Sequence, residues 1–252
     1  MTENPYTPDF FKTNLAHSYP SAKQIVSLVL EFLSIRSVLD VGCGTGYFLR
    51  AFIEAGVGDF VGIDGDYVPR DQLVIKPETF YPVNLASGFD LRRRFDLVLS
   101  LEVAEHLPAD CAERFVDSLT RHSSVILFSA ALPHQGGTGH VNEQWPSYWA
   151  QHFEKRGYRA YDILRPRLWH NQEVAWWYRQ NILVFVNDEG CIAHPKLAGL
   201  KPAAPISLDR VHPELYLLQL KRFEDIQKFL ASGSTFETER SVEGKLNIKK
   251  IR

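Results

Sequence analysis

Two carboxylates and an imidazole occur within one short stretch, "LEVAEHLP", at residues 101–108. Glu102, Glu105 and His106 are spaced i, i+3 and i+4, so a single helical turn would place the three side chains on one face. Carboxylates combined with imidazole suit Mg²⁺, Mn²⁺ or Fe²⁺. A histidine here could equally act as a general base. In a purely structural alternative, the carboxylates complement the amino end of the following helix.

The neighbouring segments indicate where this stretch lies. It follows the apolar run "FDLVLSL" at 95–101, which predicts a buried strand, and a second such run at 124–130 predicts the adjacent strand. His134 and His140 come after that second run. Ligands of open α/β sheets bind beyond the carboxyl ends of the strands, so these groups should converge there. The candidate metal ligands are therefore Glu102, Glu105, His106 and His140, and the candidate bases are His106 and His140.

A glycine-rich turn is the most specific motif in the chain. "VLDVGCGTGYFL" reads as a strand through Asp40, a G-x-G-x-G turn at 42–46, and a helix. Glycines let a ligand approach the backbone closely. Tyr47 stands where a dinucleotide fingerprint has its third glycine, and no basic residue between Asp40 and Arg50 could meet a phosphate. Asp64 ends the next apolar run, about 20 residues on, where a carboxylate can hold ribose hydroxyls.

Helical and strand patterns alternate over most of the chain. The apolar spacing in "SAKQIVSLVLEFL" predicts a helix from Ser21, which forms a capping box with Gln24. The alternation predicts a parallel sheet with helices on both faces. The runs at 158–164 and 180–186 have no comparably clear helix between them, so an antiparallel hairpin is expected at one sheet edge.

These segments resemble class I S-adenosylmethionine-dependent methyltransferases. The resemblance rests on "LDVGCGTG" (39–46), "GIDG" (62–65), "FDLVLSLEVAEHL" (95–107) and "VILFSA" (125–130), and covers roughly 35–190. It implies an α/β fold: a doubly wound, mostly parallel seven-stranded Rossmann-like sheet with an antiparallel edge hairpin, followed by a C-terminal helical tail. It also implies S-adenosylmethionine as the methyl donor.

The same resemblance implies where that donor binds. Its methionyl part would lie against the turn at 42–46, its ribose on Asp64, its adenine near Asn84 and Leu85, and its sulfonium near Ser100 or Leu101. The candidate cofactor-binding residues are Asp40, Gly42, Cys43, Gly44, Gly46, Asp64, Asn84, Leu85, Ser100 and Leu101.

The E-x-x-E-H spacing is similar to that of two metal-binding methyltransferase groups. One group O-methylates catechol-like rings in ubiquinone biosynthesis; the other methylates the terminal 2′-hydroxyl of small RNAs and has a further histidine. Glu102, Glu105 and His106 match residue by residue, whereas His140 stands at a different spacing from that later histidine. Many related enzymes carry "EH" after the fourth strand without a metal. A metal site, a metal-free histidine base and a structural role therefore stay open.

Tryptophans are concentrated in the second half, where all five fall within residues 145–177. The glycine-rich loop "HQGGTGHVNEQW" leads into this region with several hydrogen-bonding side chains. Aromatic faces and such groups suit a hydroxylated ligand. An alternative for Trp169, Trp176 and Trp177 is packing between the last two strands. This part also resembles methyltransferases from bacterial glycan and metabolite biosynthesis clusters, which implies a sugar or sugar-nucleotide acceptor.

Composition narrows the partners. A net charge of −2 over 252 residues does not favour nucleic acid. The three cysteines form no C-x-x-C pair, which is typical of a reducing cytoplasm. The first residues do not read as a secretory signal, and no apolar run has membrane-spanning length. We expect an N-terminal lid at 1–20, a methyltransferase domain at 21–190, and a linker with a helical extension at 191–252. The helix at 213–233 covers the core or forms a homodimer contact.

The sequence thus predicts a cytoplasmic O-methyltransferase that acts on a small hydroxylated metabolite, with S-adenosylmethionine and, in one alternative, a divalent metal. Two further alternatives are an RNA 2′-O-methyltransferase and a methyltransferase-like protein that binds a ligand without turnover.

Overall fold

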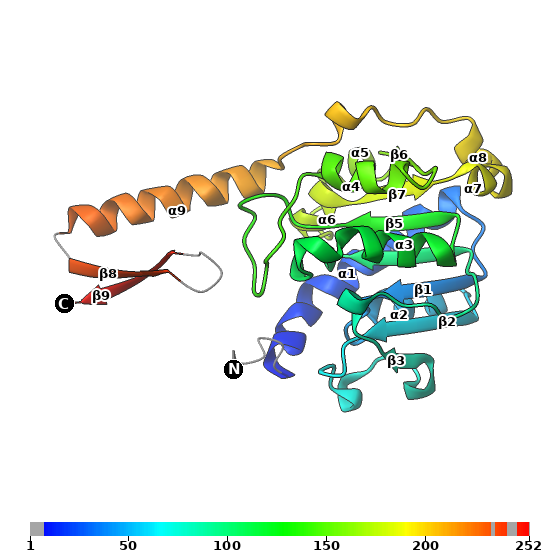
Figure 1. Cartoon of the computed structure of the whole chain (residues 1–252), viewed down its shortest axis with the longest axis horizontal. Helices are drawn as coiled ribbons and strands as arrows, with labels where there is room; N and C mark the ends of the chain where they lie inside the picture. The colour runs from blue at the N-terminus through cyan, green and yellow to red at the C-terminus, as the bar shows by residue number, and fades with distance from the viewer. Residues whose placement is uncertain (1–7, 233–234, 241–245, 252) are drawn as a thin grey trace. The chain divides into compact units, whose positions relative to one another are not determined.

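A seven-stranded sheet organises the first of two compact units, Met1–Arg210 (Figure 1). The computed structural model describes residues 8–232, 235–240 and 246–251. The strands are β1 (Ser37–Val41), β2 (Asp59–Asp64), β3 (Phe80–Pro82), β4 (Leu97–Leu101), β5 (Val125–Ser129), β6 (Arg159–Tyr161) and β7 (Leu183–Val186). Their order is β3-β2-β1-β4-β5-β7-β6.

The pairing of the strands confirms the predicted sheet. β1 to β5 pair in parallel with one another, whereas β7 runs antiparallel to both β5 and β6. β1 and β4 lie side by side, and the chain winds outward from them in both directions. Such a switch point is where open α/β sheets bind ligands.

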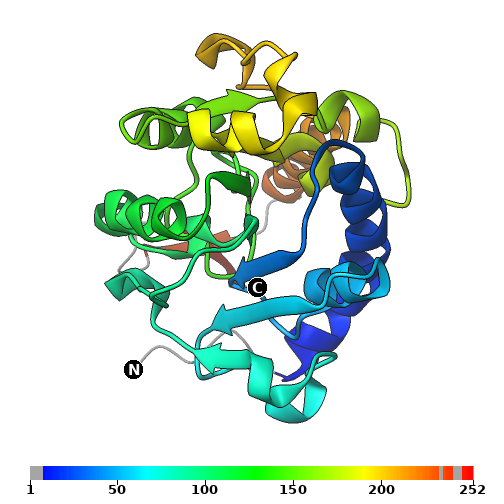
Figure 2. The same ribbon diagram turned by 90° about the vertical axis from the view of Figure 1, so that its right-hand side faces the viewer.

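Helices cover both faces of the sheet (Figure 2). On one face, α1 (Pro8–Phe32) and α2 (Tyr47–Glu54) pack on strand residues such as Val38 and Leu97. On the other face, α3 (Ala112–His122) and α4 (Pro146–Glu154) pack on residues such as Leu39 and Val98. Successive strand residues face opposite sides, so both cores come from the same strands.

The first helix begins earlier than predicted, because α1 starts at Pro8 and continues through Pro20. Ser21 is therefore no N-cap: its Oγ accepts a hydrogen bond from the Ala175 amide at 2.9 Å. Tyr19 donates to Glu54 Oε2 of α2 at 2.6 Å, a tertiary contact that supports the helix before the proline. Of the predicted lid at 1–20, residues 1–7 lie outside the described residues, and 8–20 are helical.

The segment expected to be a linker packs on the first unit. It includes the end of α7 (Asp188–Ala193) and all of α8 (Pro195–Ala198), and it buries Leu197 and Leu208 completely. These leucines follow no regular period, so the sequence pattern did not predict their burial. The short helices α5 (Arg165–Leu168) and α6 (Trp176–Asn181) connect β6 to β7.

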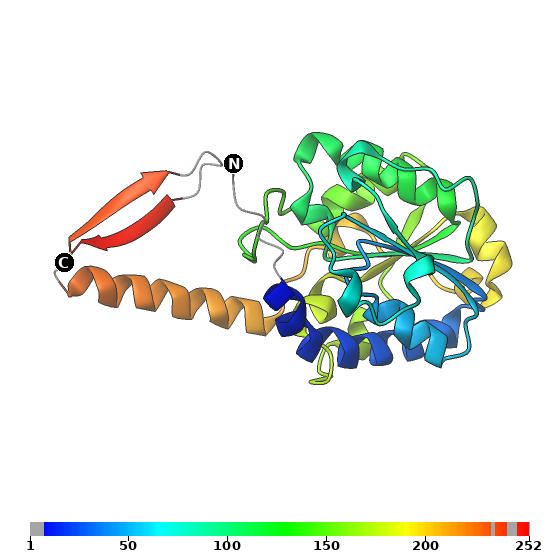
Figure 3. The same cartoon turned by 90° about the horizontal axis from the view of Figure 1, so that it is seen from below.

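The second unit, Val211–Arg252, contains the predicted final helix, α9 (Pro213–Ala231), shown in orange in Figure 3. A hairpin that the sequence analysis did not predict follows it: β8 (Thr235–Arg240) pairs antiparallel with β9 (Leu246–Ile251).

Candidate functional site

The glycine turn joins β1 to α2 at the carboxyl edge of the sheet. Gly42, Gly44 and Gly46 have φ values of 81°, 52° and 97°, a left-handed conformation that disfavours other residues. A Cβ on Gly42 would lie 2.3 Å from Val103 Cγ2. The glycines thus let the turn bend sharply and let the chain after β4 pack against it.

Asp64 tethers the end of β2 to this turn. Its Oδ2 accepts a hydrogen bond from the Gly44 amide, and its Oδ1 accepts from the Gly65 amide and the Tyr67 hydroxyl, each at 2.7 Å. Burial raises the pKa of the Asp64 carboxyl, and these three donors act in the opposite direction. The side chain is thus a preorganised acceptor at the carboxyl edge.

Asp40 is a buried carboxyl for which the described residues supply no side-chain hydrogen bond. Burial, and then the charge of Asp64, raises its pKa to about 8. Burial likewise raises the pKa of the neighbouring Cys43 thiol, so this cysteine is no activated nucleophile. A ligand that carries a positive charge at this turn would offset the cost of ionising Asp40.

The raised pKa of Asp40 predicts how stability depends on pH. Because the folded-state pKa exceeds the unfolded value, the folded state binds more protons, and stability falls as pH rises toward about 8. Asp40→Asn should remove this contribution. We expect its melting temperature to exceed that of the wild type by an amount that grows between pH 5 and pH 8, reaching on the order of 5 °C in ligand-free protein. Calorimetry at several pH values measures it; a constant difference would contradict the assignment.

The remaining predicted cofactor residues surround the same edge. Asn84 caps a short turn, where its Oδ1 accepts from the Ala86 amide at 3.1 Å, and Leu85 is buried behind it. Ser100 and Leu101 end β4; the Ser100 Oγ is buried and has no hydrogen-bond partner. The structure therefore brings these residues to the end of the sheet that holds the glycine turn.

The predicted helical turn at 102–106 is wrong. Only Ala104–His106 form a 3₁₀ turn, and Glu102 before it has a left-handed φ of 56°. In this conformation the Glu102 carboxylate accepts hydrogen bonds from buried amides, and it stays close enough to Glu105 for its charge to raise the pKa of that residue. Asn181 Nδ2 donates to both of its carboxylate oxygens, at 3.0 and 3.2 Å, and Gln135 Nε2 donates at 3.2 Å. Burial raises the pKa of Glu102 to about 7.

Glu105, His106 and His140 form a compact cluster. One potential ligand atom from each of the three lies within 4.8 Å of the others. The rings of His106 and His140 meet edge to face, with centroids 4.8 Å apart. Both carboxylate oxygens of Glu105 are buried, and among the described residues neither has a hydrogen-bond partner. Burial, and then the charge of Glu102, raises the pKa of Glu105 well above its usual range.

The two histidines differ in their surroundings. Burial lowers the pKa of His106 to about 4, with a smaller contribution from the charge of His140. This imidazole is therefore neutral at pH 7. His140 Nδ1 lies 2.9 Å from Glu143 Oε1, which orients the ring. Glu143 also accepts hydrogen bonds from the amides of His134 and Gly136, at 2.8 and 2.7 Å. One carboxylate thus holds the glycine-rich loop and aims His140.

The loop is also fixed to the 3₁₀ turn. The amides of Val141 and Asn142 donate to the backbone oxygen of Glu105, at 2.9 and 3.0 Å. Asn142 is buried, and its Nδ2 has no hydrogen-bond partner. Residues from two different connections therefore act as one structural unit, as the strand order predicted.

The amide residues that bind Glu102 were missed by the sequence analysis. Gln180 and Asn181 lie in α6 just before β7, and Gln135 follows β5. Gln180 Nε2 donates to Gln135 Oε1 at 3.1 Å and completes the network. A usable signal was present: the start of an antiparallel strand lies at the same edge as the ends of its parallel neighbours, so polar residues before 182–186 belong to that edge.

The tryptophans do not form one surface. Trp149 is fully buried against the sheet, whereas Trp145, next to the His140 loop, is 40% exposed. Trp176 and Trp177 belong to α6 rather than to a gap between strands, and Trp177 packs partly on the core.

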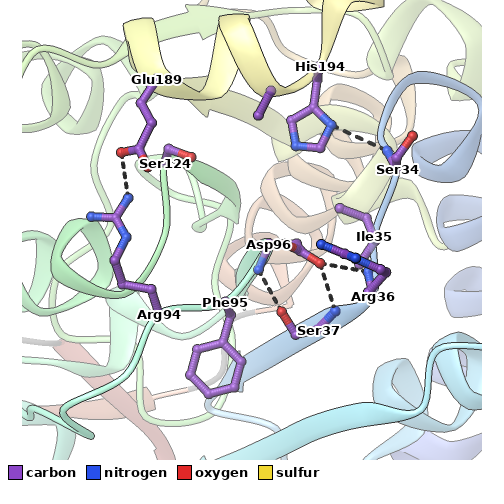
Figure 4. Close-up of a pocket in the computed structure, with 11 residues that line it drawn as sticks. Ser34, Ile35, Arg36, Ser37, Arg94, Phe95, Asp96, Ser124, Glu189 and His194 are labelled. Carbon is purple, nitrogen blue, oxygen red and sulfur yellow. Dashed lines mark hydrogen bonds and ion pairs between the residues drawn. The ribbon is translucent and has the colours of Figure 1, made fainter.

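A cavity of about 570 Å³ lies at the opposite, amino-terminal edge of the sheet (Figure 4). Both carboxylates that line it, Asp96 and Glu189, have partners. Arg94 Nη2 lies 2.7 Å from Glu189 Oε2, and Asp96 accepts from the amides of Arg36 and Ser37. Among the described residues, the buried carboxylate without a hydrogen-bond partner, that of Glu105, lies at the carboxyl edge instead, which favours that edge as the reaction site.

Within the described ranges, no helix combines the length and apolar character needed to cross a bilayer.

Comparison with known proteins agrees with the fold. A family model described as a methyltransferase domain matches residues 15–180, more than half of the chain. A ubiquinone biosynthesis O-methyltransferase of Rhodopseudomonas palustris is 27% identical over 131 residues, which cover 47% of this chain and 45% of that protein. The match spans less than half the length of that curated relative.

Two solved structures show similar architecture. The sugar N-methyltransferase KedS8 of a Streptoalloteichus species aligns with a TM-score of 0.55 at 18% identity, covering 72% of this chain and 92% of that one. The magnesium protoporphyrin IX methyltransferase of Synechocystis with bound SAH aligns with a TM-score of 0.51 at 18% identity, covering 69% and 84%. At such identities, the similarity concerns the fold.

Proposed function

The chain belongs to the family of class I S-adenosylmethionine-dependent methyltransferases, and from this premise we propose that it methylates a hydroxyl oxygen of a small hydroxylated metabolite, of the sugar or sugar-nucleotide class, with help from a divalent cation. The observation that carries the proposal is the Glu105 carboxylate, which is buried beside two imidazoles and receives no hydrogen bond from the part of the chain that the structure describes.

The glycine turn fits S-adenosylmethionine. Asp40 is a buried carboxyl without a side-chain partner, and the methionyl ammonium and the sulfonium of this donor both carry positive charge. Asp64 is held in place as an acceptor and suits the ribose hydroxyls. The sequence of the turn itself, between Asp40 and Arg50, contains no basic residue that could bind a phosphate. These residues would bind and orient the donor.

The cluster of Glu105, His106 and His140 fits a divalent cation. One carboxylate and two imidazoles suit Mg²⁺, Mn²⁺ or Fe²⁺, and a cation would neutralise the buried charge of Glu105. When bound, the cation would lower the pKa of an acceptor hydroxyl. His106 is neutral at pH 7, which is the form that ligates metals. Glu102 would not itself bind the cation, because its carboxylate already accepts hydrogen bonds from Asn181 and Gln135.

Oxygen is the proposed target because a hydroxyl must lose a proton as it receives the methyl group. The chain offers two means: the metal cluster, and direct acceptance of the proton by His140, which Glu143 orients. We favour the metal cluster because a histidine base alone would leave the buried charge of the Glu105 carboxylate without a counter-charge.

The loop that carries His140 favours a sugar as the acceptor. Asn142 offers a buried amide nitrogen without a partner, and Trp145 offers a partly exposed aromatic face. Such a pair suits the hydroxyls and apolar face of a sugar ring. KedS8, whose fold is similar, is named a sugar N-methyltransferase, so it is consistent with a sugar acceptor and says nothing for a hydroxyl target.

The test is a turnover assay on a panel of sugars and sugar nucleotides. Protein stripped with a chelator is given S-adenosylmethionine, then Mg²⁺, Mn²⁺ or Fe²⁺, and S-adenosylhomocysteine and the product are measured by mass spectrometry. We expect a methyl ether that forms only with the cation. Unchanged turnover after chelation would exclude the metal, and an N-methyl product would exclude the hydroxyl acceptor. Donor binding without turnover would favour the non-catalytic alternative, and turnover on RNA alone the RNA alternative.

Glu143→Gln should disturb catalysis by releasing the orientation of His140. The amide keeps the size of the side chain but loses its charge and one acceptor oxygen. We expect kcat to fall about 10- to 100-fold, with little change in the affinity for S-adenosylmethionine. Steady-state kinetics across pH measure it. The exposed Glu154→Gln is the matched control, and equal kcat values for the two variants would exclude a positioning role for Glu143.

A further inference from the structure

The final helix, α9, has an apolar stripe along its length. Six large apolar side chains on it are between 41% and 60% exposed: Tyr216, Leu217, Leu220, Phe223, Ile226 and Leu230. Tyr216, Leu220, Phe223 and Leu230 are spaced i, i+4, i+7 and i+14, so they lie on one face. Leu215 is the only residue of the helix that is fully buried in the described structure. A stripe of this kind on a surface is typical of an interaction site.

The charges of α9 are arranged about the middle of this stripe. Lys221 and Arg222 come directly before Phe223, and Glu224 and Asp225 come directly after it. The apolar residues have the same symmetry, since Leu220 and Ile226 are three positions from Phe223 on either side, and Tyr216 and Leu230 are seven positions away. Over residues 219–227 the pattern therefore reads alike from both ends, except that the charges change sign.

We propose that α9 pairs with α9 of a second copy of this chain, antiparallel and about a two-fold axis beside Phe223. In that arrangement, Leu220 lies level with the partner's Ile226. The same alignment sets Lys221 and Arg222 beside the acidic pair of the other helix. A parallel copy would set each charge beside its own kind, which is unfavourable. Self-complementarity about a two-fold axis is what a closed dimer interface requires.

These observations identify the partner of α9 as the same helix of a second copy of this chain. Charge of opposite sign on the two halves of one helix specifies an identical helix running the other way. The helix has 19 residues and is therefore about 28 Å long. The half-exposed apolar side chains of this helix leave apolar surface in water, and a partner helix would cover the stripe. The inference concerns assembly and does not depend on the proposed reaction.

Sedimentation of the full chain tests the interface. The weight-average mass should rise from 28.8 kDa toward twice that value as the concentration is increased. Phe223→Asp places like charges at the two-fold axis and should remain monomeric. Ile206→Asp, at a side chain 88% exposed outside α9, is the control and should dimerise like the wild type. A wild type that stays monomeric at all concentrations, or a Phe223→Asp variant that still dimerises, would overturn the proposal.

A charge exchange tests the complementarity. Lys221→Glu with Arg222→Glu makes the centre of α9 wholly acidic, and Glu224→Lys with Asp225→Lys makes it wholly basic. Each double variant alone should be monomeric, and an equal mixture should form heterodimers. Failure of the mixture to associate, with both variants helical by circular dichroism, would exclude the charge pairing.

Spin labels test the orientation. A label at Ala231 should lie about 25 Å from its counterpart in the antiparallel pair, because each label is eight residues from the axis at 1.5 Å per residue. In a parallel pair the two labels would lie about 10 Å apart, and this result would contradict the proposed arrangement.

Discussion

Glu105→Gln is expected to abolish methyl transfer while raising the thermal stability of the metal-free protein. The wild-type carboxylate is buried without a hydrogen-bond partner and close enough to Glu102 for the charge of that residue to raise its pKa. A neutral amide removes this repulsion, so the metal-free variant should melt several degrees higher at pH 8, on the order of 5 °C. The same change removes the one carboxylate of the proposed metal cluster. Loss of several kcal/mol of transition-state stabilisation corresponds to a rate about 10³-fold lower.

Three measurements separate the parts of this prediction: initial rates, metal content by elemental analysis, and calorimetry after chelation. The exposed Glu78→Gln serves as the matched control and should leave all three unchanged. Retained metal and rate in Glu105→Gln would remove Glu105 from the site. A lower melting temperature in the metal-free variant would show that the carboxylate stabilises the fold, contrary to its burial without a partner.

Asp64→Ala is expected to weaken S-adenosylmethionine binding at least 100-fold. The substitution removes the acceptor proposed for the ribose hydroxyls. It also frees the Gly44 and Gly65 amides, which Asp64 holds at 2.7 Å. Two hydrogen bonds to a charged group are together worth about 3 kcal/mol or more, which corresponds to roughly 100-fold in affinity. Isothermal calorimetry with S-adenosylmethionine and with S-adenosylhomocysteine measures the effect.

The control is Tyr67→Phe, which removes one donor to Asp64 and keeps the carboxylate. Its affinity should stay within a few-fold of the wild type. Wild-type affinity in a folded Asp64→Ala variant would contradict the role of Asp64. Tight binding of NADH by the wild type, without binding of the methyl donor, would overturn the interpretation of the turn itself.

Local patterns were sufficient for the sheet and for the turn. The strands at 37–41 and 97–101 are mostly apolar, as expected for parallel strands that are buried on both faces. The turn at 42–46 needs a left-handed backbone conformation, which mainly glycine adopts. The spacing of the glycines was therefore enough to predict the turn. α9 could be predicted in the same way, because the proline at its first turn and the spacing of its apolar residues are local features of the sequence.

The detailed geometry of the candidate site depends on residues that are far apart in the sequence. A pattern of i, i+3 and i+4 predicted three ligands on one turn, but Glu102 has a left-handed φ and joins Asn181 and Gln135 instead. That conformation depends on the Ser129 backbone, whose oxygen accepts from the Glu102 amide at 3.0 Å across the sheet. No periodicity within the stretch encodes such a partner.

By itself, then, the amino-acid sequence determined the order of strands and helices, the glycine turn, and the acidic and imidazole groups at the carboxyl edge, because each depends on residues near one another along the chain. The tertiary structure alone decided which of those groups meet. It placed His140 beside Glu105 and His106, and it surrounded Glu102 with amides from α6, because β7 runs antiparallel and returns its first residues to the same edge. Contacts between distant segments follow from packing, which a linear pattern does not record.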